Sequence, residues 1–594
     1  MAQSLNNYII RASIFLIATF VIVVLLYPVL QNAFLSNIFI NIIILLALLV
    51  GIVFNLFHLI NLNYKYISYS NFNITNSIEA FSTLRGQEKN ISLELKNLDG
   101  KYFFKSSSIN RLIENSDMTL VSIRETSRYL VGLLVFLGLL GTFWGLLKTI
   151  GSSTQPNKAF IQFDAFLKAL PSGVQTLSLF ANSPKVLDLV INIMGNAPNL
   201  ALRLSKNPGL LDNILSRDFY HSPGNHKDLD GELKKILHYA RYFEDQLDIA
   251  RRWTNDKKFQ NGTQLLLGTI EGHMCCKTLS DVAEIALQAM FACVRTEFEK
   301  IHGVFETGDM AILAFGKLGS RELMQESDLD LVFVYNHLPM ETKSNGIKPL
   351  SANIYFMRLA QRIITSLTVL TSEGKLYSVD TRLRPHGKKG PIASHILSFE
   401  RYYATSAWTW EYMALSRARV VVGSAKLLER IKKMQRSVLM QRRNQTKLKY
   451  EVTAMRGRIA ARFPGTEIWD IKYKPGGLVD IEFIAQYLQL QNANAYPEIL
   501  SPNTISSLGL LKKHGHLTSQ ACFDLIEGYK FWHNIGSILR ITATTNLENI
   551  EYDKGPQRML AQAGGVPTFD KLIEKINQTS ANISMHYKNI LGNY

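Results

Sequence analysis

The chain has 594 residues, of which 47% are hydrophobic and 19% charged, so it is long enough for several domains with buried cores. Its formal net charge of +17 suits a phosphate-rich substrate, nucleic acid or an anionic membrane surface. Four cysteines exclude a disulfide framework and predict reduced thiols, and the spacing of His273, Cys275 and Cys276 matches no common zinc site.

The N-terminal 152 residues read as a membrane segment with three spans. Residues 14–30 and 38–60 are apolar runs near spanning length, and neither contains Lys, Arg, Asp or Glu. A third run, residues 129–150, carries four glycines that would let helices approach closely. The many basic residues between positions 61 and 128 predict that this stretch is cytoplasmic, as is the short N-terminus.

The most telling part of the third run is Gly138 to Leu146, Gly-Leu-Leu-Gly-Thr-Phe-Trp-Gly-Leu. Through it, residues 1–152 resemble the MotA/TolQ/ExbB proton-channel family. The resemblance implies a further helix, which is not found here, and a proton-carrying carboxylate. None of the three spans contains a carboxylate, so a partner subunit would supply it. Thr142 either lines a pore or packs against a neighbouring helix.

Residues 158–305 are predicted to form a soluble, mainly helical lead-in. Apolar side chains recur at spacings of three and four in residues 163–170 and 173–180, which is typical of helices with one buried face. Pro184, Pro198 and Pro208 separate short helices.

The clearest chemical signal lies between Met310 and Tyr335. An apolar run leads into the glycine turn with Gly319 and Ser320, and Asp328-Leu-Asp330 opens a second apolar run. This pattern predicts strand, turn, short helix and strand. Alternate residues of a strand share a face, so Asp328 and Asp330 could share a Mg²⁺ ion, unless they only solvate the strand start. Backbone N–H groups of the turn could face an anion.

The stretch Leu376 to Gly387 reads as a neighbouring strand that ends in a glycine turn, and it would supply Asp380 as a third carboxylate. The period-two rule puts Arg382 and Arg384 on one face, where they either hold phosphate oxygens or form a surface pair. The aromatic-rich stretch 399–419 offers a wall for a nucleotide base or, alternatively, helix core.

Residues 425–594 are predicted to be helical, beginning with a strongly basic helix that is either a solvated face or a dock for an acidic partner. The turn at Pro475-Gly476-Gly477 interrupts the helical pattern. Lys472 and Lys474 before it could face a triphosphate. Asp480 after it either joins such a site or caps the helix that runs on to Leu490.

Gly-Ser followed by Asp-Leu-Asp marks the wider nucleotidyltransferase superfamily, and the stretches 402–415 and 474–483 are more specific. With them, residues 158–594 resemble the C-terminal, adenylylating half of the glutamine-synthetase adenylyltransferase/adenylyl-removing enzymes. The resemblance implies an α+β nucleotidyltransferase domain over residues 306–424, a mixed sheet with flanking helices. A helical lead-in (158–305) and a helical C-terminal domain (425–594) would enclose it.

The resemblance also implies a reaction. ATP binds with Mg²⁺ on Asp328 and Asp330, a tyrosine hydroxyl of glutamine synthetase attacks the α-phosphorus, and pyrophosphate leaves. Asp380 helps to deprotonate the tyrosine, whose unperturbed pKa is about 10. Glutamine synthetase is the implied protein substrate and the PII signalling protein a further partner, whereas nucleic acid is not expected. The nucleotide-binding residues implied are Gly319, Ser320, Arg382, Arg384, Lys474 and Asp480.

The resemblance implies that complete enzymes of this family carry a related domain in front, which removes AMP. This chain has membrane-like sequence in that place, so we expect it to adenylylate without de-adenylylating. The expected location is the bacterial inner membrane with the enzyme domain in the cytoplasm. Three spans from a cytoplasmic N-terminus would instead place residue 151 onward outside, so the two halves conflict. The alternative function is a channel-like membrane subunit with a non-functional enzyme remnant.

Overall fold

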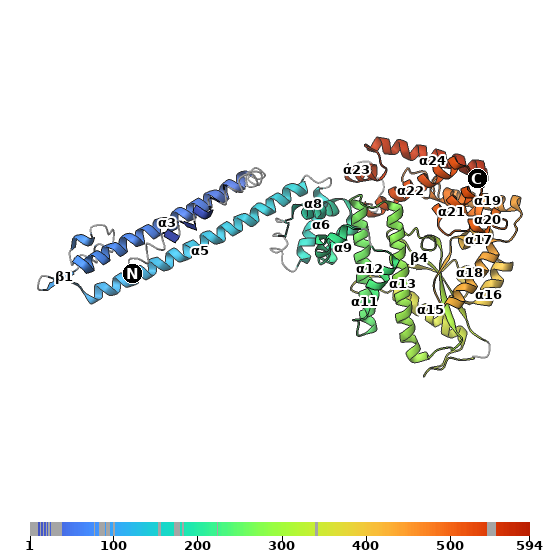
Figure 1. Ribbon diagram of the computed structural model, residues 1–594, viewed down its shortest axis with the longest axis horizontal. Coiled ribbons are helices and arrows are strands. Elements are labelled where there is room, and N and C mark those ends of the chain that lie inside the picture. The colour runs from blue at the N-terminus through green and yellow to red at the C-terminus, as the bar shows by residue number, and fades with distance from the viewer. Residues whose placement is uncertain are drawn as a thin grey trace. The chain divides into compact units, whose positions relative to one another are not determined.

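The computed structural model divides the chain into two compact units, one of residues 1–151 with 172–184, the other of residues 152–171 with 185–594 (Figure 1). The structure describes these residues: 38–75, 78–81, 95–98, 101–151, 156–170, 179–180, 183–221, 224–338, 342–542 and 554–593, together with residue 90 and single positions between residues 10 and 24.

The first unit is built on two long helices, α3 (Ile38–Thr75) and α5 (Ser106–Gly151), which pack side by side (Figure 1). Between them lie a short helix, η1 (Ile78–Phe81), and an antiparallel hairpin of β1 (Leu95–Leu98) and β2 (Lys101–Phe104). The Ser127 hydroxyl of α5 donates to Oδ1 of Asn55 in α3 at 2.8 Å.

One helix of the described residues is long and apolar enough to cross a membrane, α3 over Asn41–Thr75. The predicted span 38–60 lies inside this helix, which continues past the apolar run. The predicted span 129–150 forms the second half of α5 and stays a prediction as a span, whereas residues 14–30 lie largely outside the described residues. Residues 61–128 are not one loop, because α3 ends and α5 begins within them.

The second unit begins with helices that bear out the predicted lead-in, and Pro156, Pro184 and Pro198 each open one of them. The predicted helix at 163–170 lies in the first of these helices, and most of 173–180 lies outside the described residues. The elements are α6 (Pro156–Ala169), α8 (Pro184–Asn196), α9 (Pro198–Lys206), α10 (Leu210–Leu215), η2 (Arg217–Tyr220), α11 (His226–Leu237), α12 (Phe243–Leu266) and α13 (Gly272–His302).

A small mixed sheet follows, with strand order β5-β4-β3-β7 and with β6 also paired to β4. The central strand β4 runs antiparallel to β3 and parallel to β5 and β6, and β3 runs antiparallel to β7. Leu331 to Val334 of the central strand are fully buried, so the sheet forms a core layer. The strands are β3 (Asp309–Ala314), β4 (Leu329–Asn336), β5 (Val379–Asp380), β6 (Ala393–His395) and β7 (Arg419–Val422).

Helices flank this sheet and make up the rest of the chain, as expected of an α+β domain followed by a helical one (Figure 1). The long α13 contacts α15 as well as α22 of the C-terminal part, so the sheet domain and its helical neighbours form one unit. These elements are α14 (Gly316–Gly319), α15 (Ala352–Thr368), η3 (Gly387–Lys389), α16 (Ile396–Thr405), α17 (Thr409–Ser416), α18 (Ala425–Leu439), α19 (Gln445–Arg462), α20 (Leu478–Asn492), η4 (Pro497–Ile499), α21 (Thr504–Lys513), α22 (Ser519–Thr542), α23 (Lys554–Ala563) and α24 (Phe569–Leu591).

Candidate active site

Three aspartates meet at one end of the central strand. The parallel pairing of β4 with β5 puts Asp330 directly opposite Asp380. Asp328 lies two residues before Asp330, and the intervening Leu329 is fully buried in the core. Since alternate side chains of an extended chain share a face, Asp328 and Asp330 both point away from the core toward Asp380. The structure therefore brings the three predicted carboxylates together.

The mutual repulsion of these carboxylates shows in Asp330. Burial, followed by the charges of Asp380 and Asp328, raises the pKa of Asp330 to about 6. A divalent cation would relieve this repulsion, and a donor set made only of carboxylate oxygens suits Mg²⁺. The residues therefore fit the implied ion, with Asp328 and Asp330 as its ligands.

Asp380 is already engaged by Arg382. The Arg382 Nε donates to Oδ2 of Asp380 at 2.7 Å, and the Arg382 backbone N–H donates to Oδ1 at 2.8 Å. These hydrogen bonds hold the pKa of Asp380 below its ordinary value, so this carboxylate stays ionised. Arg382 is two-thirds exposed and can turn toward a bound anion.

The prediction that Arg382 and Arg384 share one face of a strand is wrong. The strand β5 ends at Asp380, and both arginines lie in the turns that follow it. Arg384 donates from Nε to the carbonyl of Gly390 at 3.0 Å and from Nη1 to the carbonyl of Thr381 at 2.8 Å. Arg384 therefore holds the loop in shape, while Arg382 is the one beside the aspartates.

Gly316 is a residue of the site that the sequence reasoning left out. Its φ is +54°, in the left-handed region that favours glycine, and a Cβ there would lie 2.3 Å from Oδ2 of Asp330. Only a glycine lets the turn come this close to the Asp330 carboxylate. The positive φ needed by a tight turn is the signal that could have found it.

Gly319 and Ser320 shape the same turn. Their backbone N–H groups donate to the carbonyls of Phe315 at 3.0 Å and Gly316 at 3.1 Å. A Cβ on Gly319 would lie 2.3 Å from the carbonyl oxygen of Arg417, and the Ser320 hydroxyl is buried, accepting from Arg417 Nη2 at 3.0 Å. In this conformation both N–H groups serve the turn, and their role toward phosphate stays a prediction.

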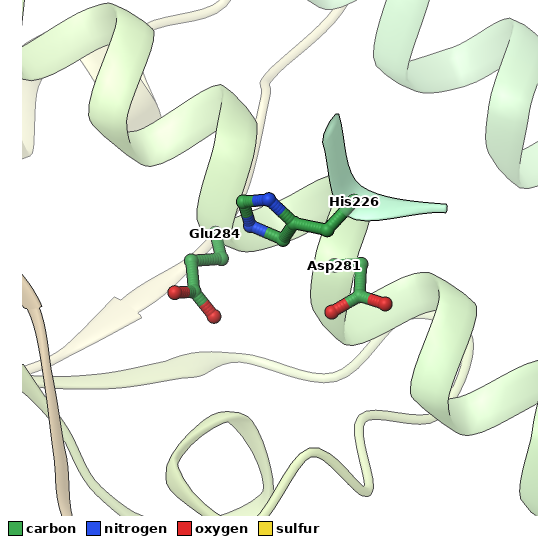
Figure 2. A group of neighbouring side chains, drawn as sticks. All are labelled: His226, Asp281 and Glu284. Carbon is green, nitrogen blue, oxygen red and sulfur yellow. The ribbon is translucent and has the colours of Figure 1, made fainter. Parts of the chain in front are cut away.

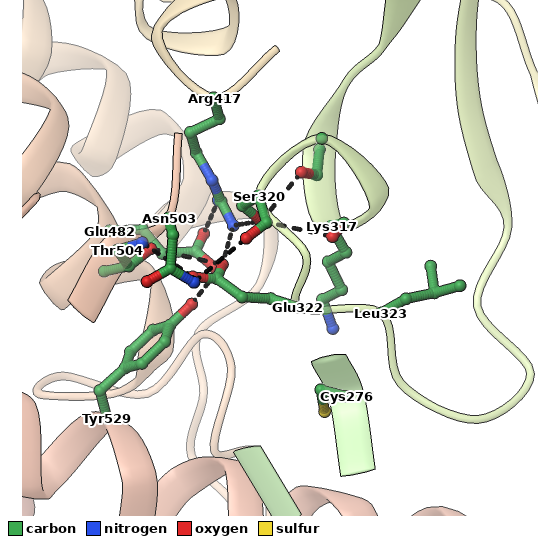
Figure 3. Close-up of polar contacts among 12 residues, drawn as sticks. Cys276, Lys317, Ser320, Glu322, Leu323, Arg417, Glu482, Asn503, Thr504 and Tyr529 are labelled. Carbon is green, nitrogen blue, oxygen red and sulfur yellow. Dashed lines mark hydrogen bonds and ion pairs between the residues drawn. The ribbon is translucent and has the colours of Figure 1, made fainter. Parts of the chain in front are cut away.

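A buried network behind the turn joins it to the C-terminal helices (Figure 3). Glu322 accepts from the Thr504 backbone N–H at 2.9 Å, from the Tyr529 hydroxyl at 2.7 Å and from Arg417 Nη2 at 2.7 Å. Arg417 also pairs with Glu482 of α20 at 2.8 Å. Sequence reasoning missed this network because its members come from separate parts of the chain.

The two basic residues before the glycine turn of the C-terminal part have different surroundings. Lys474 is buried, with Nζ near the carbonyl of Ile468 (3.5 Å) and above the Trp532 ring. Lys472 is exposed, with Nζ over the Tyr473 ring, and its positive charge offsets part of the rise in the pKa of Asp330. Of the two lysines, Lys472 is therefore the one open to a ligand.

Asp480 lies in the protein interior. Its Oδ1 pairs with Arg456 Nε at 2.5 Å, its Oδ2 accepts from the Gly476 backbone N–H at 2.6 Å, and the residue is fully buried in the first turn of α20. Both oxygens are engaged by protein groups. These contacts leave no Asp480 oxygen for a nucleotide, and the hydrogen bond to Gly476 is not a cap of α20, whose N-cap, Gly477, has no side-chain cap bond.

Lys317 is a further cation at this end of the sheet. Burial, and then the charges of Arg540 and Lys472, lower its pKa to about 8. Figure 3 shows its side chain extending away from the Arg417 network toward Cys276. Among the aromatic residues, Tyr403 is fully buried and the Tyr402 hydroxyl donates to Glu411 at 2.7 Å, which matches the core alternative for that pair.

A small mixed sheet with an Asp-x-Asp pair on its central strand and a third aspartate on the parallel neighbour is typical of a nucleotidyltransferase-like domain. Comparison with known families agrees with this class. Residues 187–434 match the model of the glutamate-ammonia ligase adenylyltransferase family, and residues 447–591 match that of the GlnD PII-uridylyltransferase family.

The chain is also similar to proteins named bifunctional glutamine synthetase adenylyltransferase/adenylyl-removing enzyme. The one from Bradyrhizobium diazoefficiens is 35% identical over 446 residues, 75% of this chain and 45% of that protein. The Brucella melitensis protein is 36% identical over 428 residues, 72% and 43% of the two chains. The Agrobacterium fabrum protein is 35% identical over 450 residues, 75% and 45%. The chain spans less than half the length of these relatives.

Proposed function

We propose that this chain is an ATP-dependent adenylyltransferase that moves AMP onto a tyrosine of glutamine synthetase and releases pyrophosphate. The observation that carries the proposal is the register of Asp330 against Asp380, with Asp328 two residues away. Asp328 and Asp330 lie within the segment that matches the glutamate-ammonia ligase adenylyltransferase family. The names of the relatives supply the protein substrate.

In the proposed reaction, Asp328 and Asp330 would hold Mg²⁺, and the bound ion would supply positive charge to neutralise the triphosphate. The tyrosine oxygen forms a bond to the α-phosphorus while the α–β phosphoanhydride bond breaks, and pyrophosphate carries away the electron pair. Arg382 keeps Asp380 ionised, so this carboxylate can accept the tyrosine proton. Asp380 then passes the proton to solvent. Arg382 and Lys472 bind phosphate oxygens, as their exposed cations allow.

The proposed partners follow from the same matches. Glutamine synthetase is the substrate, and the match of residues 447–591 to a PII-uridylyltransferase family supports the PII signalling protein as a regulatory partner. For location we propose the bacterial inner membrane, held by α3, with the enzyme unit in the cytoplasm. The two family matches begin after residue 186 and lend no support to the proton-channel resemblance, so we do not favour the channel alternative.

The test is AMP transfer by the full chain, in detergent, onto purified glutamine synthetase with labelled ATP and Mg²⁺. We expect the variant with Asp328→Asn and Asp330→Asn together to lose labelling and Asp164→Asn to keep it, since Asp164 is a half-exposed residue paired with Lys168. Absence of labelling by the unaltered chain, or labelling that survives the double substitution, would refute the proposal.

A further inference from the structure

A second group of possible metal ligands lies on α13, apart from the three aspartates. Asp281 and Glu284 are three residues apart and so share one face of this helix, and His226 opens the neighbouring α11. One ligand atom from each residue lies within 4.8 Å of the other two, as Figure 2 illustrates. Among the described residues, this is the one group of three or more possible ligands whose atoms come this close together, which the three aspartates do not.

The group contains polar atoms that the protein leaves unsatisfied. Asp281 is 8% exposed, and its Oδ1 is buried without a hydrogen bond from any described residue. The Nε2 of His226 is likewise buried and without a hydrogen-bond partner among the described residues. Buried polar atoms are nearly always hydrogen-bonded, so two unsatisfied ones within a single group of possible ligands point to an additional ligand.

Two arginines partly balance the carboxylates, but only one of them does so closely. Arg419 Nη2 lies 2.8 Å from Oε2 of Glu284, which leaves the other oxygen of that carboxylate for a different ligand. Arg321 lies 3.8 Å from both Asp281 and Glu284, beyond hydrogen-bonding distance. The Arg321 side chain is 38% exposed, and its Nε is buried without a hydrogen-bond partner among the described residues, so no close contact fixes this guanidinium.

We propose that His226, Asp281 and Glu284 bind a divalent transition-metal ion, with Zn²⁺ as the ion that fits. One imidazole and two carboxylates are a three-ligand set that Zn²⁺ accepts with a fourth position left open. The imidazole distinguishes this group from the aspartate site, whose oxygen-only donors suit Mg²⁺. The ion takes the place of the Arg321 guanidinium as the charge that balances Asp281.

A chain of hydrogen bonds connects the proposed metal site to the glycine turn of the candidate active site. Arg419, which binds Glu284, also donates from Nε to the carbonyl of Gly319 at 2.7 Å and from Nη2 to that of Leu318 at 3.2 Å. A metal ion bound to Glu284 would therefore weaken the ion pair between Glu284 and Arg419, the arginine that holds the glycine turn. Metal binding at this group can be measured without any AMP transfer.

The experiment titrates Zn²⁺ into untagged, metal-stripped full-length protein by calorimetry, with excess Mg²⁺ present to occupy the aspartate site. Co²⁺ absorption gives a second readout that reports the ligand set. We expect one tight Zn²⁺ per chain. His226→Ala and Asp281→Asn should each weaken it by at least about tenfold, since loss of a mere outer-shell partner already costs 10- to 100-fold.

Two controls separate this site from other histidines and aspartates. His238→Ala removes an exposed histidine at the C-terminal end of α11, the helix that His226 opens. The double variant with Asp328→Asn and Asp330→Asn removes the other acidic site. Both should keep the tight Zn²⁺. Arg321→Met should strengthen binding, because it removes the competing cation.

No stoichiometric Zn²⁺ on the unaltered chain, or binding that survives both His226→Ala and Asp281→Asn, would overturn the proposal. If both ligand variants fail to fold, as judged by circular dichroism, Arg321→Met decides the question. Tighter Zn²⁺ binding by that variant supports the site, and unchanged affinity overturns it.

Discussion

At the scale of single residues, the charged form of the buried Asp330 carboxylate lowers the stability of the folded protein. Its pKa in the folded protein, about 6, lies above the value of about 3.9 for an unfolded chain. Between these pH values the native state binds more protons than the unfolded state, so stability falls as pH rises from about 4 to about 6. Above pH 6 the whole penalty is present, and a bound cation would relieve it.

We therefore predict that Asp330→Asn raises the melting temperature at pH 7, where it removes a buried charge whose cost is of order 1–3 kcal/mol. The gain should vanish near pH 4, where Asp330 is already protonated. Differential scanning fluorimetry at the two pH values measures this. Mg²⁺ should stabilise the unaltered protein at pH 7 and have less effect on the variant. An equal shift at both pH values would contradict the charge argument.

A second prediction concerns the glycine against this carboxylate. Gly316→Ala forces a Cβ to within 2.3 Å of Asp330 Oδ2 at a φ of +54°, so Asp330 must move. We expect AMP transfer to fall at least about 100-fold, as a displacement near 1 Å does, and stability to fall by about 1–3 kcal/mol.

The matched control is Gly509→Ala, in the helix α21, where an added Cβ meets no atom within 4 Å and φ is not positive. It should leave AMP transfer unchanged and stabilise the helix slightly. If Gly316→Ala retained full AMP transfer, the close packing of this turn on Asp330 would have no functional meaning.

At the scale of elements, the loop after α14 is held by helices from far along the chain. Glu322 is 4% exposed and binds Arg417, Thr504 and Tyr529, so strand, turn and C-terminal helices share one buried charge network. Burial and the nearby Glu322 charge raise the pKa of Tyr529 well above its ordinary value, so its hydroxyl remains a donor. The active-site turn is thus positioned by the helical part that follows it.

Tyr529→Phe should therefore destabilise the protein by about 1–3 kcal/mol, because it takes a hydrogen bond from a buried carboxylate. Glu322→Gln should cost several kcal/mol, since Arg417 then loses one of its two buried partners. Thermal or urea unfolding measures both. The double variant should lose less than the sum of the two, and strict additivity would show that the two side chains do not interact.

At the scale of the whole molecule, one unit carries a helix suited to a membrane and the other carries the three aspartates of the candidate active site. Apolar side chains of α3, including Leu49 and Val53, are exposed, which water disfavours and a bilayer accepts. The proposed ATP-dependent reaction requires that the second unit lie on the side of the membrane where ATP is found. One span and three spans both carry the chain across the membrane, so α3 as a single span permits this only with the N-terminus on the outer side, contrary to the location predicted for it.

We predict that the full chain stays with the membrane fraction after a high-salt and carbonate wash. Leu49→Lys with Val53→Lys should release it, because a lysine at the centre of a span costs about 2.5–3.5 kcal/mol. Phe103→Lys, an exposed apolar position on β2, is the control and should remain membrane-bound. A wild-type chain found in the soluble fraction would contradict the anchoring.

Local patterns in the sequence were sufficient for several parts of the fold. The apolar runs around Gly316 to Asp330 predicted strand, turn and strand, and the alternation rule predicted that Asp328 and Asp330 share a side. The short helix predicted after the turn instead lies at the turn itself, as the four residues Gly316–Gly319. Prolines marked helix starts because a helix tolerates them only in its first turn. Such features depend on neighbours a few residues apart.

The sequence by itself determined the Asp-x-Asp strand, the glycine turn and the helical C-terminal part, since each follows from spacing along the chain. Only the tertiary structure decided that Asp380 stands opposite Asp330, that Lys474 is buried whereas Lys472 is exposed, and that Asp480 is buried against Arg456. It alone brought His226 to Asp281 and Glu284. Strand register and helix packing are set by the burial of whole apolar faces, which no local spacing records.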